Sequence, residues 1–210
     1  MPESLLALAA PWLAPALVLW GSPITWLELI AVVLSITMVW CNLRVNPTGW
    51  PLAIVSSALY AVLFASSRLY GEASLQLLFI AVSCWGWWQW LRGRGGDGQA
   101  LRVHRLSRTQ RATIIALTLL AWPLLALLLA RHTDTDVPFL DALPTAGSVA
   151  GQFLLGRKLI ENWLVWLAVN VFSIGLFAYK QLWLTAALYA LFAALSVVGW
   201  RAWRARLATG

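Results

Sequence analysis

Residues 157–179 read RKLIENWLVWLAVNVFSIGLFAY, and residues 44–66 read RVNPTGWPLAIVSSALYAVLFAS. Each stretch starts with an arginine, passes through a short polar turn and continues as an apolar run without charge. The uncharged runs come close to the roughly 20 residues that a helix needs to cross a bilayer. The two stretches therefore predict transmembrane helices that start on a basic side of the membrane.

The composition of the whole chain agrees with this prediction. Of 210 residues, 61% are hydrophobic and only 11% are charged, whereas roughly a quarter of the residues of a soluble domain carry charge. We expect an all-α membrane protein with seven core transmembrane helices. Their predicted spans are residues 24–42, 50–67, 73–91, 112–130, 137–156, 163–179 and 181–200.

The first 23 residues are also apolar, but Pro11 and Pro15 would each remove a helical hydrogen bond in lipid. We interpret residues 1–23 as an interfacial or re-entrant segment. A signal peptide is disfavoured because Glu3 is the one early charge and a basic n-region is missing.

An internal repeat relates residues 27–90 to residues 140–203 at an offset of 113 without a gap. Seventeen of the 64 positions are identical, and the identities include arginine, tryptophan and glycine pairs that an apolar composition does not produce by chance. Each repeat covers three spans and one span lies between them, so the two repeats face the same way across the membrane. Such a 3+1+3 arrangement of parallel repeats, which is found among transporters, would enclose a site between its halves. The alternative is that duplication merely produced a stable helical bundle.

The expected organisation follows from the repeat. It comprises the N-terminal segment 1–23, the first three-helix repeat 24–92, a basic loop and connector helix 93–131, the second repeat 132–204 and a tail 205–210.

The distribution of positive charge predicts the topology. Twelve of the fifteen basic residues fall on one side when the loops are numbered alternately. By the positive-inside rule this side is cytoplasmic, with the N-terminus outside and the C-terminus inside. The net charge of +7 therefore reports topology, and nucleic-acid binding is the weaker interpretation.

Asn170 is the clearest polar candidate within a span. The stripe on the predicted helix advances by three or four residues through Trp163, Trp166, Asn170, Ser173 or Ile174, and Phe177. An amide beside indole rings suits a flat heteroaromatic solute, above all a cationic one. The alternatives are that the two tryptophans belong to an interfacial belt and that Asn170 ties two helices together.

Gln76 and Tyr189 occupy equivalent positions of the two repeats and can both donate and accept hydrogen bonds. We expect them to line a shared cavity. The run WGWWQW at residues 85–90 ends just before Arg92, where tryptophan typically anchors a helix at the headgroups.

The sequence offers little for catalysis. Both histidines, His104 and His132, fall in predicted loops, and no His/Cys cluster has metal-ligand spacing. We expect neither an enzyme nor a metal or other cofactor, and the lack of buried acids gives ion coupling no obvious carrier.

Several strings resemble the PnuC family of vitamin transporters. They are PFLD at residues 138–141, RKLIENWLVWLAVN at 157–170, LYGEASLQLLF with WGWWQW at 69–90, and the segment from Tyr189 to Trp203. The resemblance covers about residues 24–206. It implies a fold similar to the SWEET sugar transporters, a homotrimer in the inner (plasma) membrane, and facilitated diffusion of nicotinamide riboside.

By the same resemblance six residues match positions that face the substrate: Gln76, Asn162, Trp163, Trp166, Asn170 and Tyr189. Thiamine and riboflavin are the alternative substrates that relatives carry, and a non-transporting membrane scaffold is the alternative from another class. The expected partners are a cationic heteroaromatic vitamin or nucleoside and the lipid bilayer.

Overall fold

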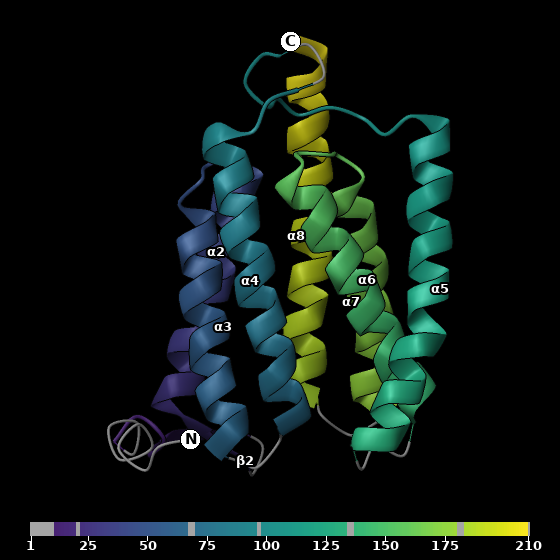
Figure 1. Ribbon diagram of the computed structural model, residues 1–210. Coiled ribbons are helices and arrows are strands. Elements are labelled where there is room, and N and C mark those ends of the chain that lie inside the picture. Colours follow the sequence, from purple (N-terminus) through teal and green to yellow (C-terminus); the bar gives the residue numbers. More distant parts are fainter. Residues whose placement is uncertain are drawn as a thin grey trace. The chain divides into compact units, whose positions relative to one another are not determined.

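The computed structural model describes residues 11–19, 22–66, 70–95, 98–133, 137–179 and 183–209. The chain divides into two compact units, residues 1–84 and 85–210, and each unit is described by itself. The described residues form a short hairpin and seven helices (Figure 1). The elements are β1 (Pro15–Leu19), β2 (Ser22–Thr25), α2 (Trp26–Leu43), α3 (Gly49–Ser66), α4 (Tyr70–Arg92), α5 (Arg108–His132), α6 (Pro138–Gly156), α7 (Asn162–Tyr179) and α8 (Trp183–Thr209).

The seven helices coincide with the seven predicted spans. Four of them are long and apolar enough to cross a membrane by length and composition, and they lie at Trp26–Leu43, Arg108–His132, Asn162–Tyr179 and Thr185–Ala208. In α3 the apolar stretch Gly49–Ala65 is slightly shorter. Helix α6 contains three glycines and three alanines, small residues that let neighbouring helices approach closely.

The N-terminal segment is where the structure adds an unpredicted element. Strands β1 and β2 pair antiparallel as a hairpin, and β2 leads directly into α2. The side chain of Thr25 caps α2 by accepting a hydrogen bond from the backbone N–H of Glu28 at 3.2 Å. Residues 1–10 and 20–21 of the predicted interfacial segment lie outside the described residues.

The first unit contains a helical pair, α2 and α3, that is joined through serines. The hydroxyls of Ser35 and Ser56 lie 2.9 Å apart, and Ser56 also donates to the carbonyl of Ala31 at 3.1 Å. Ser56 and Ala31 are both buried. Small hydroxyl residues at a helix contact supply hydrogen bonds and allow close approach in an apolar environment.

The internal repeat is visible in the backbone of two turns. Val45 and Lys158, which are 113 residues apart, have positive φ angles of 57° and 53°, and they are the described non-glycine residues with that conformation. The flanking hydrogen bonds repeat as well: Val45 N–H donates to Asn42 O at 3.1 Å, and Lys158 N–H donates to Leu155 O at 2.9 Å. Since a β-branched valine rarely adopts this conformation, the shared geometry indicates a common local design.

In the second unit, α7 packs against both α6 and α8. Val169 of α7 would contact a Cβ placed on Gly147 of α6, and Trp166 would contact one placed on Gly151. On the other side, Trp163 would meet a Cβ on Gly199 of α8. Side chains on α7 thus fill the space left by glycines on its neighbours, which is the close packing expected where both helices are apolar.

Candidate functional site

Asn170 lies in the interior of the second unit, on the face of α7 that contacts α8. The residue is 5% exposed, and its Nδ2 donates to the hydroxyl of Ser196 at 3.3 Å. Ser196 in turn donates to the carbonyl of Phe192 one turn earlier in α8 at 2.8 Å. The buried amide therefore links two helices.

An aromatic cluster continues this face of α7 toward the helix end at Tyr179. The rings of Phe177 and Tyr189 are 5.0 Å apart, and Phe192 approaches Tyr189 edge-on at 6.3 Å. These three rings and the Asn170–Ser196 pair lie along the contact between α7 and α8. An amide beside aromatic rings offers contact area and one oriented hydrogen bond, which is what a flat heteroaromatic group can use.

Trp163 and Asn162 lie at the other end of α7 and are fully enclosed. Asn162 is 0% exposed and donates through Nδ2 to the carbonyl of Leu159 at 2.6 Å. Trp163 is 3% exposed, and its ring meets Trp203 edge-on at 5.6 Å. Among the described residues, neither Asn162 Oδ1 nor Trp163 Nε1 has a hydrogen-bond partner. A buried acceptor and a buried donor are thus left for a water or a solute.

The six predicted residues divide into separate groups. Asn170 and Tyr189 lie along the α7–α8 contact. Asn162 and Trp163 lie at the start of α7, next to Arg157 and Lys158, and this end of the second unit is called its basic end. Trp166 turns toward Gly151 of α6. Gln76 belongs to α4 in the first unit and is half-buried. The predicted stripe on α7 is therefore split between two neighbouring helices, because Trp163, Asn170 and Phe177 face α8 whereas Trp166 faces α6.

The tryptophan-rich end of α4 contains both packed and exposed rings. Trp85 stacks on Phe153 at 5.3 Å, and Trp90 donates from Nε1 to the carbonyl of Leu155 at 2.9 Å. Trp87 and Trp88 are 38% and 54% exposed, as the predicted headgroup anchors would be. The run thus contains two exposed indoles, Trp87 and Trp88, and two indoles, Trp85 and Trp90, that contact α6.

A network at the basic end of the second unit was not predicted. It is formed by the α4–α5 loop (residues 93–107) and the α6–α7 turn (residues 157–161). Backbone hydrogen bonds join His104 N–H to Lys158 O at 3.1 Å and Ile160 N–H to His104 O at 3.0 Å. Lys158 Nζ donates to Leu101 O at 2.9 Å, and burial lowers the pKa of this lysine.

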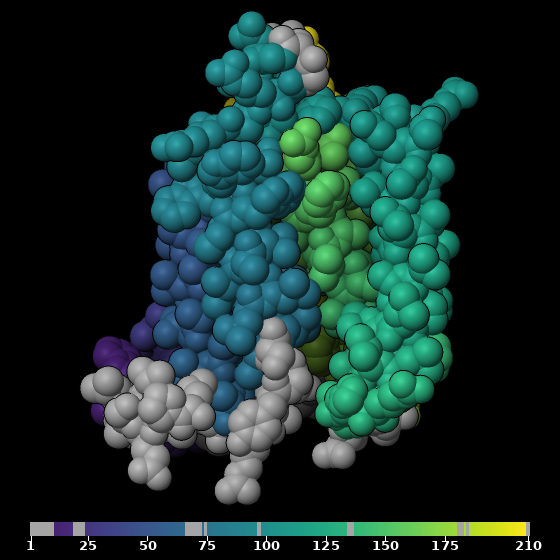
Figure 2. Space-filling view, viewed as in Figure 1, coloured from purple at the N-terminus to yellow at the C-terminus, as the bar shows by residue number. Residues whose placement is uncertain are grey.

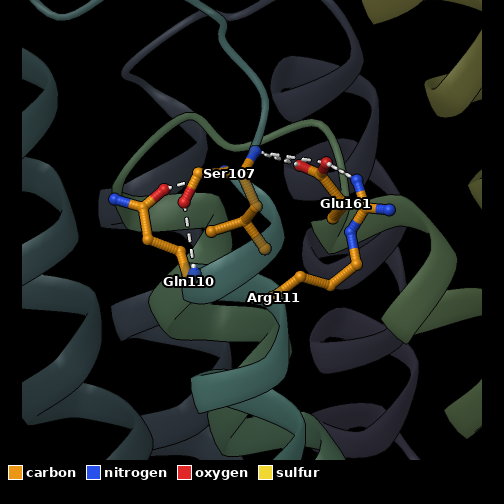
Figure 3. Close-up of polar contacts among 5 residues, drawn as sticks. Ser107, Gln110, Arg111 and Glu161 are labelled. Atoms are coloured by element: carbon orange, nitrogen blue, oxygen red, sulfur yellow. Dashed lines mark hydrogen bonds and ion pairs between the residues drawn. The ribbon is translucent and has the colours of Figure 1, made fainter.

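Glu161 is the central residue of this network (Figure 3). The residue is 8% exposed, and both of its carboxylate oxygens accept from the backbone N–H of Leu106 at 3.2 Å. It also forms an ion pair with Arg111 of α5 at 3.2 Å. In the adjoining turn, Ser107 and Gln110 form a reciprocal capping box at the start of α5. One carboxylate therefore holds both the loop and the connector helix to the start of α7.

Replacement of Glu161 by glutamine is expected to loosen the α4–α5 loop. The amide retains one acceptor but loses the charge that strengthens its bonds, at a cost of about 1–2 kcal/mol given that Arg111 is half-exposed. Hydrogen exchange at the Leu106 amide should become roughly tenfold faster. Arg108→Gln removes a charge from an exposed residue of the same helix and is the control. Unchanged exchange in the Glu161 variant would show that the carboxylate does not hold the loop.

The sequence contained a signal for two residues that were missed. Ser196 is the repeat counterpart of Ser83, and both serines are buried, at 3% and 1% exposure. Glu161 is an acid on a side otherwise dominated by arginine. Within the described ranges, no three His, Cys, Asp or Glu side chains gather as possible metal ligands.

Long apolar helices with an amide and aromatic rings buried among them define a multi-helix membrane protein of the kind that moves small solutes. Residues 25–205 match the family model described as nicotinamide mononucleotide transporter. The chain belongs to this family of membrane transporters, which are not enzymes.

Relatives and a solved structure support the same assignment. The chain is 20% identical over 207 residues to the nicotinamide riboside transporter PnuC of Escherichia coli (strain K12), with 87% of each protein covered. It is 27% identical over 198 residues to the riboflavin/roseoflavin transporter RibM of Streptomyces davaonensis, with 91% of each covered. The crystal structure of the vitamin B3 transporter PnuC matches with a TM-score of 0.68 at 25% identity, over 85% of this chain and 80% of that one. The resemblance to the PnuC family is thus confirmed.

Proposed function

We propose that this transporter carries nicotinamide riboside by facilitated diffusion. The observation that carries the proposal is the family match over residues 25–205, together with the similarity to PnuC proteins along most of the chain. Nicotinamide riboside presents a flat pyridinium ring, which suits an aromatic surface with a hydrogen-bonding amide. The α7–α8 contact of the second unit has both features in Phe177, Tyr189 and Asn170.

The proposed mechanism is alternating access between two three-helix repeats, residues 24–92 and 132–204, in a SWEET-like 3+1+3 arrangement. The shared backbone geometry at Val45 and Lys158 supports a genuine duplication. If each of the seven helices crosses once, the single connector α5 makes the repeats face the same way. The N-terminal segment 1–23, the loop and connector 93–131 and the tail 205–210 complete the proposed organisation.

The proposed substrate residues are Asn170 and Tyr189, with Trp166, Asn162, Trp163 and Gln76 contributing to the path. The buried Asn170 amide has an acceptor beyond its bond to Ser196. Asn162 and Trp163 add an acceptor and a donor that lack partners among the described residues. An intramembrane polar group without a full set of partners favours a role in the solute pathway.

We place the protein in the inner (plasma) membrane as a homotrimer, with the C-terminus in the cytoplasm. The orientation is supported by the clustering of arginine at the ends of α4, α6 and α8 and in the α4–α5 loop. The trimer rests on the family resemblance alone.

Uptake into proteoliposomes tests substrate and mechanism together. We expect saturable uptake of labelled nicotinamide riboside without a proton or sodium gradient. Since the substrate is a cation, an inside-negative potential of 100 mV should raise its accumulation at equilibrium by about 50-fold, which corresponds to about 2.3 kcal/mol for one charge. Uptake that requires an ion gradient would refute the uniport mechanism.

Riboflavin is the second candidate substrate, because RibM is similar to the chain over 91% of each protein. Riboflavin is uncharged, so its uptake should not respond to the membrane potential. Unlabelled riboflavin and thiamine are therefore added as competitors in the same assay. Two results together would identify riboflavin, and not nicotinamide riboside, as the substrate. These are competition by unlabelled riboflavin and uptake of labelled riboflavin that does not depend on the membrane potential.

A further inference from the structure

Cavities border the connector helix α5 at the end where the Arg111–Glu161 ion pair joins it to the start of α7. At the opposite end it is fixed to α6, where Trp122 Nε1 donates to the carbonyl of Phe139 at 2.7 Å. Figure 2 shows α5 as an exposed column, with the green surface of the following helices recessed beside it. Cavities of about 450 and 300 Å³ lie on two sides of α5 near the basic end.

The larger cavity is lined by residues whose polarity changes with depth. Phe153 of α6 and Arg157, the residue that caps the end of this helix, both line it. On α5, Gln110 and Ile114 line it and lie four residues apart. Trp85, which stacks on Phe153, completes the apolar part. The cavity is therefore cationic and polar at the basic end and apolar one turn deeper.

The positive charge in this cavity is not neutralised within the described residues. Arg157 donates through Nη1 to the neutral amide oxygen of Gln89 at 3.1 Å and forms no ion pair there. His104 also lines the cavity, and its Nδ1 is within 2.9 Å of the carbonyl of Arg102, which leaves Nε2 for another partner. The smaller cavity differs because Glu161 lies in its wall.

We propose that the larger cavity binds an anionic phospholipid. The headgroup phosphate is held by Arg157 and by the doubly protonated form of His104, whose Nε2–H donates to a phosphate oxygen while its Nδ1–H donates to the carbonyl of Arg102. One acyl chain lies against Trp85, Phe153 and Ile114. Arginine forms strong charge-assisted bonds to phosphate, and basic pockets between helices on the cytoplasmic side of membrane proteins bind such headgroups. The apolar depth favours a lipid over a free phosphate ion. Leu117, 57% exposed and three residues beyond Ile114, continues the apolar surface along α5.

A lipid titration of the purified full-length protein tests the proposal. Thermal unfolding in detergent is followed as phosphatidylglycerol is added, with phosphatidylcholine of the same acyl chains and inorganic phosphate as parallel titrations. Phosphatidylglycerol should raise the melting temperature in a saturable way, because a ligand of the folded state stabilises it. The other two additives should produce no such rise.

Variants locate the effect in the cavity. Arg157→Gln should shift the midpoint of the phosphatidylglycerol titration to roughly tenfold higher lipid, which is the loss expected for a charged hydrogen bond. Thr113→Phe fills the cavity from the exposed face of α5 without changing its charge and should abolish the rise. Arg204→Gln, which removes an exposed charge of α8 outside the cavity, should leave the midpoint within about twofold.

The proposal is overturned by any of three results. These are an equal rise with phosphatidylcholine, an Arg157 variant that titrates like the unchanged protein, or the same saturable rise with inorganic phosphate alone. The last result would assign the cavity to a small anion.

Discussion

Substitution of Gly199 by alanine should lower the free energy of unfolding of the second unit by about 1–3 kcal/mol, which is the usual cost of overpacking. A Cβ at this position would lie 2.5 Å from Cε2 and from Cε3 of the Trp163 ring. Those atoms belong to the rigid bicycle of the indole, so the whole side chain would have to move. Thermal unfolding of the purified protein in detergent measures the loss.

The surroundings of Trp163 explain why the ring cannot move easily. Trp203, which is 0% exposed, meets it edge-on, and Trp90 packs on Trp203 at 6.2 Å. Trp90 is itself fixed by its hydrogen bond to Leu155. A shift of the first indole would therefore propagate through a cluster of three.

Gly175→Ala is the matched control for this substitution. A Cβ on Gly175 of α7 meets nothing within 4 Å, so alanine should be neutral or raise stability by up to about 1 kcal/mol through helix propensity. Equal melting temperatures for the two alanine variants would contradict the packing argument at Gly199.

Substitution of Asn170 by leucine should reduce uptake of nicotinamide riboside by at least about fivefold. Leucine has a similar size but neither donates nor accepts, so a solute that relies on the amide loses an oriented hydrogen bond in an apolar site. Such a loss costs about 1–3 kcal/mol, or roughly five- to 150-fold in affinity. The initial rate of uptake and its concentration dependence are measured in proteoliposomes with equal protein content.

Ser196→Ala distinguishes a substrate role of Asn170 from a purely structural one. It removes the hydroxyl to which Asn170 donates and leaves the amide in place. If the amide contacts substrate, the serine variant should keep most of the uptake while the leucine variant loses it. Parallel losses of uptake and stability in both variants would show that Asn170 serves only to tie α7 to α8.

The helices were predictable because the apolar runs that form them are long and their polar interruptions are short. The run ending at Tyr179 was placed to within one residue at each end, since α7 spans Asn162–Tyr179. Helix α8 continues beyond the predicted span to Thr209, past Arg201, Arg204 and Arg206. Hydrophobicity sets where a helix leaves the apolar region, but arginine and alanine sustain helix in water as well.

Contacts between segments far apart in sequence were harder to predict. The position of Asn170 within its helix was clear from spacing, but periodicity could not show that Trp166 and Asn170 would face different neighbours. Glu161 was missed because its partners, Leu106 and Arg111, come from a loop and a helix start about 50 residues earlier. The hairpin of β1 and β2 was missed because its strands have only five and four residues and do not alternate clearly between apolar and polar side chains.

The exposure of most side chains of α5 determines how well this helix tolerates substitution. Ala126 is its one fully enclosed side chain among the described residues, and apart from Arg111 and Trp122, which contact Glu161 and Phe139, most of its side chains are exposed. Substitution by another residue of similar hydrophobicity and helix propensity should be tolerated at most exposed positions of α5. A spectroscopic reporter could therefore be attached at an exposed position of α5 such as Leu119, which leaves the closely packed helices α6, α7 and α8 unaltered.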